Sequence, residues 1–531
     1  MPTRTLPRPL HLFRGFWRPL LTLLAGGLAG LAYPTFNLWP LIFLSLAGIF
    51  VALNGVGFWH GVRLGFLAGM TFYLSCIYWI SQYLGPVPLV ALCLLEASIF
   101  AIGCGLVALV WRWLGNRTSV PALILQILAL ASLWTAREWV STRFPYGGFP
   151  WSRAAQALSD THLNRWVWFG GISWLSFVVA AVAAALALAW LHRRSLSRGG
   201  WMTLGATVAI AVGIPLGFQP SSAPENGTLR VGAVQGNAKA GLFANTVWGS
   251  ILENHLNQTK SLLADPKAAS VDMVIWPENA ADMSPLEYQS AQRRVSALVD
   301  GMNKPLIFGT TRESGQEIFN SSVLWMPGDG PVAIYDKKRP VPFAEYVPDR
   351  PFWRALAPDL IDLIQHGYTA GSRTGIFDVL DRKAGVLICF EIAIDEINRE
   401  LVDGGAQVII SQTNNADFGR SAETYQQAAL ARLQAIATGR TIVNISTVGV
   451  SAIFQPDGTV RHQVPAFTAA SIIADVNLRS SKTPAQVLGV YLELTLNLLA
   501  AGFCLLALAG QLRRSGAKGA SRYSLGHNSD I

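Results

Sequence analysis

Apolar residues are distributed unevenly along the chain. They concentrate in residues 19–218 and 485–511, whereas residues 226–480 mix apolar and polar positions as soluble proteins do. A helix needs about 20 residues to cross the ~30 Å hydrocarbon core of a bilayer. The pattern therefore predicts membrane-spanning helices, and the candidate segments are 19–33, 38–54, 63–83, 88–111, 121–140, 168–191, 201–218 and 485–510.

The composition agrees with a membrane protein. Of the 531 residues, 51% are hydrophobic and only 14% are charged, and the mean hydropathy is +0.35. A soluble protein of this length needs more polar surface. We therefore predict an N-terminal bundle of about seven spans in 1–218, a soluble domain in 226–480, a C-terminal span in 485–511 and a tail in 512–531.

The first apolar segment also resembles a signal peptide, because a basic stretch precedes it. Six further apolar segments follow before the soluble region, which favours an uncleaved first span. The first two segments are short, and they are interpreted as a hairpin or as slightly tilted helices.

Basic residues mark one side of the predicted membrane. Eight spans place both termini on that side, which the positive-inside rule makes cytoplasmic. The opposite loops contain fewer basic residues, apart from segment 141–167. The soluble domain then lies outside the cytoplasm, in the periplasm of a bacterium with two membranes. The basic residues next to apolar segments are Arg4, Arg8, Arg14, Arg18, Arg112, Arg117, Arg193, Arg194, Arg198, Arg513, Arg514, Lys518 and Arg522.

The net charge of +9 is explained by these flanking residues. Proteins that bind nucleic acid carry a basic stripe with interleaved aromatic residues, and the sequence has none. Nucleic acid is therefore not an expected partner.

Short β-branched runs alternate with amphipathic stretches in the soluble region, which predicts a layered α/β fold. The predicted helices are 244–264, 285–302 and 421–438. The predicted strands are 229–234, 271–276, 305–311, 384–390, 406–411 and 440–446.

The chain has five cysteines, and only Cys389 lies in the soluble region. A disulfide framework within that region is therefore impossible. The sequence also lacks a Cys-x-x-Cys motif or a His/Cys spacing that would hold a metal. We expect neither a metal nor a cofactor.

Three residues that could take part in catalysis follow predicted strands: Glu278 in VIWPEN, Lys337 in AIYDKK and Cys389 in GVLICFE. Catalytic groups often lie at strand ends of α/β sheets. A carboxylate can accept the thiol proton, and an ammonium can stabilise a thiolate or an oxyanion. Each residue alone has a simpler explanation, as a structural cysteine, a capping glutamate or a surface lysine.

The motifs around these residues change that balance. Trp-Pro-Glu after an apolar strand, Tyr-x-Lys before Val-Pro-Phe-x-Glu, and Gly-x-x-x-Cys-x-Glu resemble the nitrilase (carbon–nitrogen hydrolase) superfamily in that order. Over residues 15–511 the chain is similar to the apolipoprotein N-acyltransferase family of bacterial inner-membrane enzymes. The resemblance implies an α-helical membrane bundle of about eight helices that carries a nitrilase-like αββα sandwich. The matching motifs are FPYGGFPWSR (144–153), QGN (235–237), IWPEN (275–279), FNSS (319–322), VPFAEYVP (341–348) and residues 431–451.

The resemblance also implies roles for individual residues. Glu278 is the general base, Lys337 stabilises the oxyanion with the backbone N–H of Phe390, and Cys389 is the nucleophile. Supporting positions are Glu345 and Glu391, which orient Lys337 and nearby loops, Asn320, which lines the pocket, and Trp248, which matches a tryptophan at the lipid entrance.

The chain departs from the family pattern at three positions near the site. Arg339 replaces a usual His, Ala344 a common Gly, and Phe390 a frequent Tyr. These departures affect the fine architecture of the pocket, while the three central residues are intact.

The implied reaction is a ping-pong acyl transfer. A membrane phospholipid donates a fatty acyl chain to Cys389 as a thioester. The acceptor is the α-amino group of the diacylglyceryl-modified N-terminal cysteine of an apolipoprotein, the last step of lipoprotein maturation. The bilayer is therefore the third partner.

Two other functions compete with this interpretation. A membrane-anchored amidase would share the triad but release free acid. A transporter or scaffold would fit the serial spans, but no span carries the paired charges or broken-helix pattern of a substrate path.

Two features of the bundle remain open on the sequence alone. Glu96 within an apolar span is better explained by a structural partner than by a function. The segment that contains Trp151 is either an aromatic belt at the membrane interface or a loop that shapes lipid access.

Overall fold

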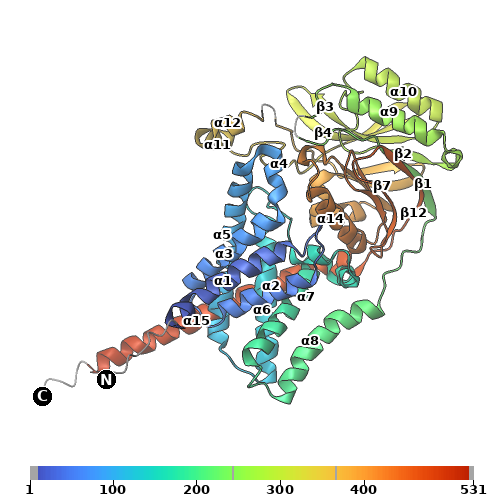
Figure 1. Cartoon of the computed structure of the whole chain (residues 1–531). Coiled ribbons are helices and arrows are strands. Elements are labelled where there is room, and N and C mark those ends of the chain that lie inside the picture. The colour runs from blue at the N-terminus through green and yellow to red at the C-terminus, as the bar shows by residue number, and fades with distance from the viewer. Residues whose placement is uncertain (1–9, 242–243, 365–366, 526–531) are drawn as a thin grey trace, which may run out of the picture.

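A computed structural model describes residues 10–241, 244–364 and 367–525, with a helical bundle below an α/β domain (Figure 1). Arg4, Arg8 and residues 526–531 of the predicted tail lie outside the described residues. Each predicted span coincides with a helix. These helices are α1 (Leu10–Gly30), α2 (Pro40–Leu53), α3 (Phe58–Cys76), α5 (Pro86–Leu114), α6 (Val120–Ser141), α7 (Val167–His192), α8 (Arg198–Gly217) and α15 (Pro484–Leu525).

Within the described residues, five helical segments are long and apolar enough to cross a membrane: α5, α6, residues 162–192, α8 and the first part of α15. The apolar helix α2 is shorter. Eight crossings therefore remain a prediction. The helix α3 ends at Cys76, before the predicted 83, and is followed by η1 (Tyr78–Ile80) and α4 (Ser81–Leu84).

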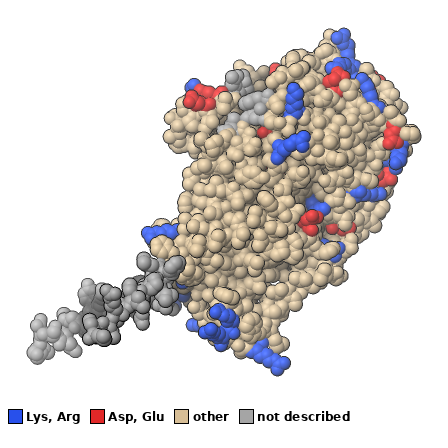
Figure 2. Space-filling model, in the orientation of Figure 1, with Lys and Arg blue, Asp and Glu red and all other residues tan. Residues whose placement is uncertain are grey.

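The surface of the bundle has the character expected of a lipid-facing protein. Figure 2 shows charged side chains over the α/β domain and basic ones at the far end of the bundle, with an uncharged surface between them. Contiguous exposed apolar surface of this extent is unusual in soluble proteins. Large apolar side chains exposed there include Leu44, Ile102, Leu125, Ile210, Leu498 and Leu505.

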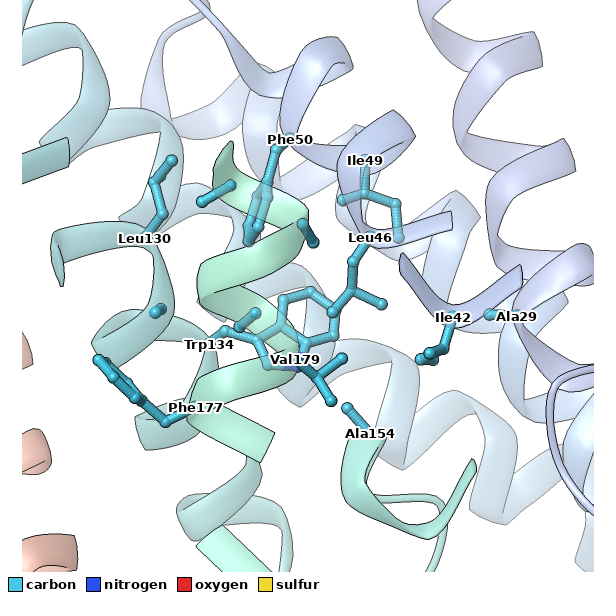
Figure 3. Close-up of a cluster of buried hydrophobic side chains, with 14 of the residues drawn as sticks. Ala29, Ile42, Leu46, Ile49, Phe50, Leu130, Trp134, Ala154, Phe177 and Val179 are labelled. Atoms are coloured by element: carbon cyan, nitrogen blue, oxygen red, sulfur yellow. The ribbon is translucent and has the colours of Figure 1, made fainter. Parts of the chain in front are cut away.

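The helices of the bundle pack through aromatic residues and through small residues. Trp134 and Phe50 lie edge to face with ring centres 5.9 Å apart, among aliphatic side chains from neighbouring helices (Figure 3). Glycines bring α3 against α5, because a Cβ on Gly65 would lie 2.4 Å from the Cβ of Cys104. Close approach through small residues is how helices associate without a hydrophobic driving force.

The α/β domain contains two six-stranded sheets. The first has the order β12 (Ala470–Asn477), β1 (Thr228–Gln235), β2 (Met273–Ile275), β3 (Leu306–Ser314), β4 (Glu317–Met326) and β5 (Gly330–Asp336). The second has the order β11 (Val460–Val464), β10 (Ser451–Phe454), β9 (Ile442–Ser446), β8 (Val408–Thr413), β7 (Arg382–Ile388) and β6 (Ile376–Val379). Parallel pairing links β1, β2 and β3, and likewise β7, β8 and β9.

Helices cover the outer face of each sheet. Residues such as Ile275 and Ile410 fill the space between the sheets. The helices α9 (Ser250–Leu263) and α10 (Gln289–Met302) pack on the first sheet, and α13 (Asp395–Asp403) and α14 (Glu423–Thr438) on the second (Figure 1). The result is an αββα sandwich. The connection from β5 to β6 carries α11 (Arg350–Leu356) and α12 (Pro358–Ile361).

Gln426 of α14 joins the α/β domain to the bundle. Its Oε1 accepts hydrogen bonds from Nε1 of Trp79 (3.0 Å) and Nε1 of Trp151 (2.8 Å). Its Nε2 donates to the carbonyl oxygens of Pro34 (3.1 Å) and Cys76 (2.9 Å). Because the Trp79 indole must reach this amide, the backbone leaves the helical path just before it, which explains the early end of α3.

Segment 141–167 lies between the two parts of the molecule, and two of its arginines form ion pairs there. Arg153 donates to both carboxylate oxygens of Asp395, at 2.7 and 3.0 Å. Arg143 pairs with Glu396 and, at 2.9 Å, with Glu493. Both arginines therefore have carboxylate partners in the α/β domain or in α15.

Replacing Arg153 with Met should lower the unfolding temperature of the purified protein in detergent. The Arg153 and Asp395 side chains are only 5% and 20% exposed, and leaving one charge of a buried pair alone costs about 3 kcal/mol. The control is Arg294→Met, which breaks an exposed pair with Glu253 and should cost less than about 1 kcal/mol. Equal unfolding temperatures for the two variants would contradict the anchoring role of Arg153.

Candidate active site

Three strand ends bring the predicted triad residues together. Glu278 follows β2 and Lys337 follows β5 in the first sheet, whereas Cys389 follows β7 in the second and begins η5 (Cys389–Ala393). Burial is nearly complete for Glu278 (4% exposed) and Lys337 (1%). The site therefore lies at one edge of the interface between the sheets.

The Lys337 ammonium lies between two carboxylates. Its Nζ is 2.8 Å from Oε2 of Glu345 and 3.5 Å from Oε1 of Glu278. Burial alone would lower the pKa of Lys337, but Glu345 and Glu278 raise it well above its ordinary value. Lys337 is therefore a permanent cation in this pocket.

Asn320 on β4 fixes both carboxylates from one amide. Its Nδ2 donates to Oε1 of Glu278 (2.7 Å) and to Oε1 of Glu345 (2.9 Å). The backbone carbonyl oxygen of Asn320 accepts from the backbone N–H of Lys337 at 2.8 Å. The sequence analysis assigned Asn320 to the pocket lining, and the structure places it at the centre of the charged cluster.

Glu278 keeps one oxygen available. Oε1 is occupied by Asn320 and Lys337, whereas Oε2 is buried with no hydrogen-bond partner among the described residues. Burial raises the pKa of Glu278, and the Lys337 ammonium opposes this effect. A free oxygen on a carboxyl group with a raised pKa is suited to accept and return a proton.

The backbone of Cys389 has a strained conformation, with φ at +54°. Non-glycine residues rarely adopt positive φ, and such residues cluster at functional sites. Burial raises the pKa of the Cys389 thiol, and the charge of Glu278 raises it further, whereas Lys337 lowers it. The thiol therefore remains protonated until a base removes the proton.

Glu391 ties the strand ends of the two sheets together. Its carboxylate accepts backbone N–H donors from Ile388 (2.8 Å), Lys338 (2.8 Å) and Arg339 (3.2 Å), and the Tyr335 hydroxyl at 2.9 Å. Burial raises its pKa, although the hydrogen bonds oppose the rise. Because Lys338 follows Lys337 and Ile388 precedes Cys389, this carboxylate sets the separation of ammonium and sulfur.

The aromatic residues predicted near the site lie in different places. Phe390 stacks on Trp151 with ring centres 6.3 Å apart and planes inclined by 5°. Trp151 is only 4% exposed, so it belongs to the contact between bundle and α/β domain. Trp248 is 56% exposed and packs on Tyr288 at 4.5 Å, and among the described contacts it touches none of the triad residues.

Two of the departures from the family pattern lie at structural contacts. The backbone N–H of Arg339 donates to the Glu391 carboxylate. The carbonyl oxygen of Ala344 accepts from the Tyr83 hydroxyl at 3.2 Å.

A polar group that was not among the sequence-predicted site residues reaches the thiol from helix α14. Gln427 Nε2 donates to Cys389 Sγ at 3.4 Å. Asn415 links Gln427 to Glu423 with two hydrogen bonds of 2.7 Å. Burial raises the pKa of Glu423 to about 8. The glutamate and the glutamines of α14 all lie buried, a property that the sequence alone does not reveal.

Comparisons with known proteins agree with both parts of the chain. Residues 25–185 match the family model of the apolipoprotein N-acyltransferase N-terminal domain, and residues 230–483 match that of carbon–nitrogen hydrolases. Apolipoprotein N-acyltransferase of Mycolicibacterium smegmatis is 30% identical over 521 residues, covering 92% of this chain and 85% of that protein. The Azotobacter vinelandii protein of the same name is 30% identical over 504 residues, covering 89% and 91%.

Solved structures similar to the chain include an amidase of Nesterenkonia from the nitrilase superfamily. It is 15% identical, has a TM-score of 0.35, and the match covers 48% of this chain and 93% of that one.

The two family models match successive parts of the chain, and the relatives match nearly its whole length. The chain therefore belongs to the apolipoprotein N-acyltransferase family and is an acyltransferase of lipoprotein biosynthesis, with a nitrilase-like domain on an apolar helical bundle.

Proposed function

We propose that the protein transfers a fatty acyl chain from a membrane phospholipid, through a thioester on Cys389, to the α-amino group of a diacylglyceryl-modified N-terminal cysteine. The observation that carries the proposal is the buried ammonium of Lys337 beside the thiol, held by Glu278 and Glu345. A thiol, a base and a fixed cation are the groups that acyl transfer requires.

In the first half-reaction, Cys389 Sγ attacks the ester carbonyl carbon while Oε2 of Glu278 takes the thiol proton. Lys337 stabilises the oxygen that becomes negative, together with the backbone N–H of Phe390. The ester C–O bond then breaks. The lysophospholipid alkoxide takes the proton from Glu278 and leaves, and the acyl chain remains on sulfur.

In the second half-reaction, the α-amino group attacks the thioester. An α-amine has a pKa near 8, so roughly a tenth is neutral at pH 7. Glu278 removes a proton from the attacking nitrogen and the C–S bond breaks. The thiolate recovers that proton, so the site returns to its starting state.

An apolar boundary beneath the thiol supports transfer to a lipid-borne amine rather than to water. Phe390 stacks on Trp151, and Phe418 lies edge to face with Trp79 at 5.2 Å and stacks on Tyr83 at 5.6 Å. These rings pack where the α/β domain meets the bundle, and Trp79 and Trp151 are each only 4% exposed. Acyl chains are better accommodated than water along such a surface.

We also assign residues 1–218 and 485–511 to the inner membrane, residues 226–480 to the periplasm, and both termini, with the tail 512–531, to the cytoplasm. The last turn of α5 carries Arg112, and the loops after α5 and α7 carry Arg117, Arg193 and Arg194. Figure 2 shows basic groups at the end of the bundle away from the α/β domain, which supports this orientation. In this arrangement Trp248 lies on a loop available to arriving lipid.

Incubation of the purified protein with phospholipid should add one acyl chain to its intact mass. The Cys389→Ala variant should show no addition, because no sulfur is available to form the thioester. The control is Cys504→Ala, which removes a half-buried cysteine of α15 and should leave the addition intact. An amidase-like enzyme would instead release free fatty acid with no lasting mass increase.

Replacing Asn320 with Leu should move the acidic limb of the pH profile of kcat/KM to higher pH. Glu278 acts in its ionised form, so activity is absent below its pKa and returns as the pH rises. The Asn320 amide lowers that pKa, and losing this donor should shift the midpoint upward by about one unit.

The control for this change is Asn444→Leu, whose amide donates to Val450 O at 2.8 Å within the second sheet. It should lower the plateau or the stability without moving the midpoint. An unmoved limb in Asn320→Leu would exclude Glu278 as the titrating base.

Membrane orientation is tested by engineered cysteines in a variant in which both Cys504 and the reactive Cys389 are replaced by alanine. A membrane-impermeant maleimide should label Asp329→Cys, an exposed turn of the α/β domain, in intact cells with a permeabilised outer membrane. The Arg117→Cys variant in the loop after α5 should be labelled only after lysis. The reverse pattern would place the α/β domain in the cytoplasm.

A further inference from the structure

We propose that Gln427, oriented by Asn415 and Glu423, is a positioning residue that presents an N–H donor to the sulfur of Cys389. The inference rests on the proposed function in one respect, that Cys389 is the nucleophile. It concerns groups of the second sheet and α14, whereas Glu278, Lys337 and Asn320 all belong to the first sheet.

The direction of the Asn415 amide is set by its surroundings. Its Oδ1 accepts from the hydroxyl groups of Ser446 (2.6 Å) and Thr424 (3.2 Å). Both hydroxyl oxygens already accept a backbone N–H, Ser446 from Gly449 at 2.9 Å and Thr424 from Val450 at 2.8 Å, so their hydrogens remain to be donated to an oxygen. The Nδ2 group must therefore point the other way, toward Glu423 and Gln427.

The direction of the Asn415 amide also fixes the direction of the Gln427 amide. Asn415 Nδ2 donates to Gln427 Oε1 at 2.7 Å. If the Gln427 amide were reversed, two N–H donors would face each other and its oxygen would face the sulfur. The Gln427 nitrogen is therefore the atom that faces Cys389, at 3.4 Å from Sγ.

Glu423 completes the chain of hydrogen bonds. Its Oε2 accepts from Asn415 Nδ2 at 2.7 Å, and the residue is only 3% exposed. Because burial raises the pKa of Glu423 to about 8, the carboxyl group is mostly neutral at pH 7. It can anchor Asn415 without adding a negative charge beside Glu278 and the thiol.

An N–H aimed at sulfur acts on the charged form of the thiol. Hydrogen bonds to charged groups are stronger than those to neutral ones. The donor therefore stabilises negative charge on sulfur when Cys389 attacks and again when the thiolate leaves. It also limits the rotation of the side chain on the strained backbone of Cys389.

The test measures the alkylation rate of Cys389 by iodoacetamide in the full-length protein in detergent, across the neutral and alkaline range. The extent of reaction is read by mass spectrometry on the Cys389 peptide, so other cysteines do not interfere. Gln427→Met keeps the length of the side chain and removes the donor. Its alkylation at pH 7 should be roughly ten-fold slower, with the pH profile displaced upward.

The control is Gln434→Met on the same helix, where the amide donates to Asp395 at 2.7 Å. Its alkylation profile should match that of the unmodified protein, even where its unfolding temperature falls. A structural effect of losing a buried glutamine would appear in both variants. Equal profiles for Gln427→Met and the unmodified protein would overturn the proposal.

Asn415→Asp tests the orientation argument with Gln427 still present. An aspartate has no donor, so the Gln427 amide should reverse and the thiol should lose its N–H. The double variant Asn415→Asp/Gln427→Met should then react no more slowly than the slower single variant, because both changes remove one interaction. Additive slowing would show that the two residues act separately, which contradicts the proposal.

Asn415→Asp also decides the question if Gln427→Met does not fold. Failure of this proposal is separable from failure of the proposed function. Alkylation reports the reactivity of the sulfur, whereas acyl addition to the unmodified protein reports its use.

Discussion

The site depends on an ammonium group that is buried between two carboxylates. Removing Lys337 from water is costly, and only close opposite charges with further hydrogen bonds compensate for this cost. Glu278, Glu345 and the Asn320 amide provide them. Two carboxylates and one ammonium leave one net negative charge. When the thiol proton moves to Glu278, that charge moves to sulfur, so the transfer exchanges the position of a charge without creating one.

Helix α14 serves both parts of the molecule through adjacent residues. Successive helical positions point about 100° apart, because a turn takes about 3.6 residues. Gln426 consequently faces the bundle, where it binds Trp79 and Trp151, while Gln427 faces the thiol. The same rigid helix therefore positions the reacting sulfur and holds the α/β domain on the bundle.

The sequence predicted features that depend on local patterns. Its candidate spans coincide with helices, its candidate strands coincide with the parallel strands of the two sheets, and its three candidate residues, Glu278, Lys337 and Cys389, follow neighbouring strand ends. Among the strands it missed is β4, which buries Asn320, Ser321 and Ser322 and so lacks an apolar–polar alternation. It also missed Gln427, since only the tertiary fold shows which face of α14 meets the sulfur.

The ion pair between Arg153 and Asp395 joins residues 242 positions apart. Ribosomes add about 5 to 20 residues per second, so the arginine is synthesised roughly ten to fifty seconds before its partner. During this interval the segment between α6 and α7 has left the ribosome with unpaired cations. The contact between the bundle and the α/β domain can therefore close only after both segments have been synthesised, which makes the assembly of the two parts a late event in biogenesis.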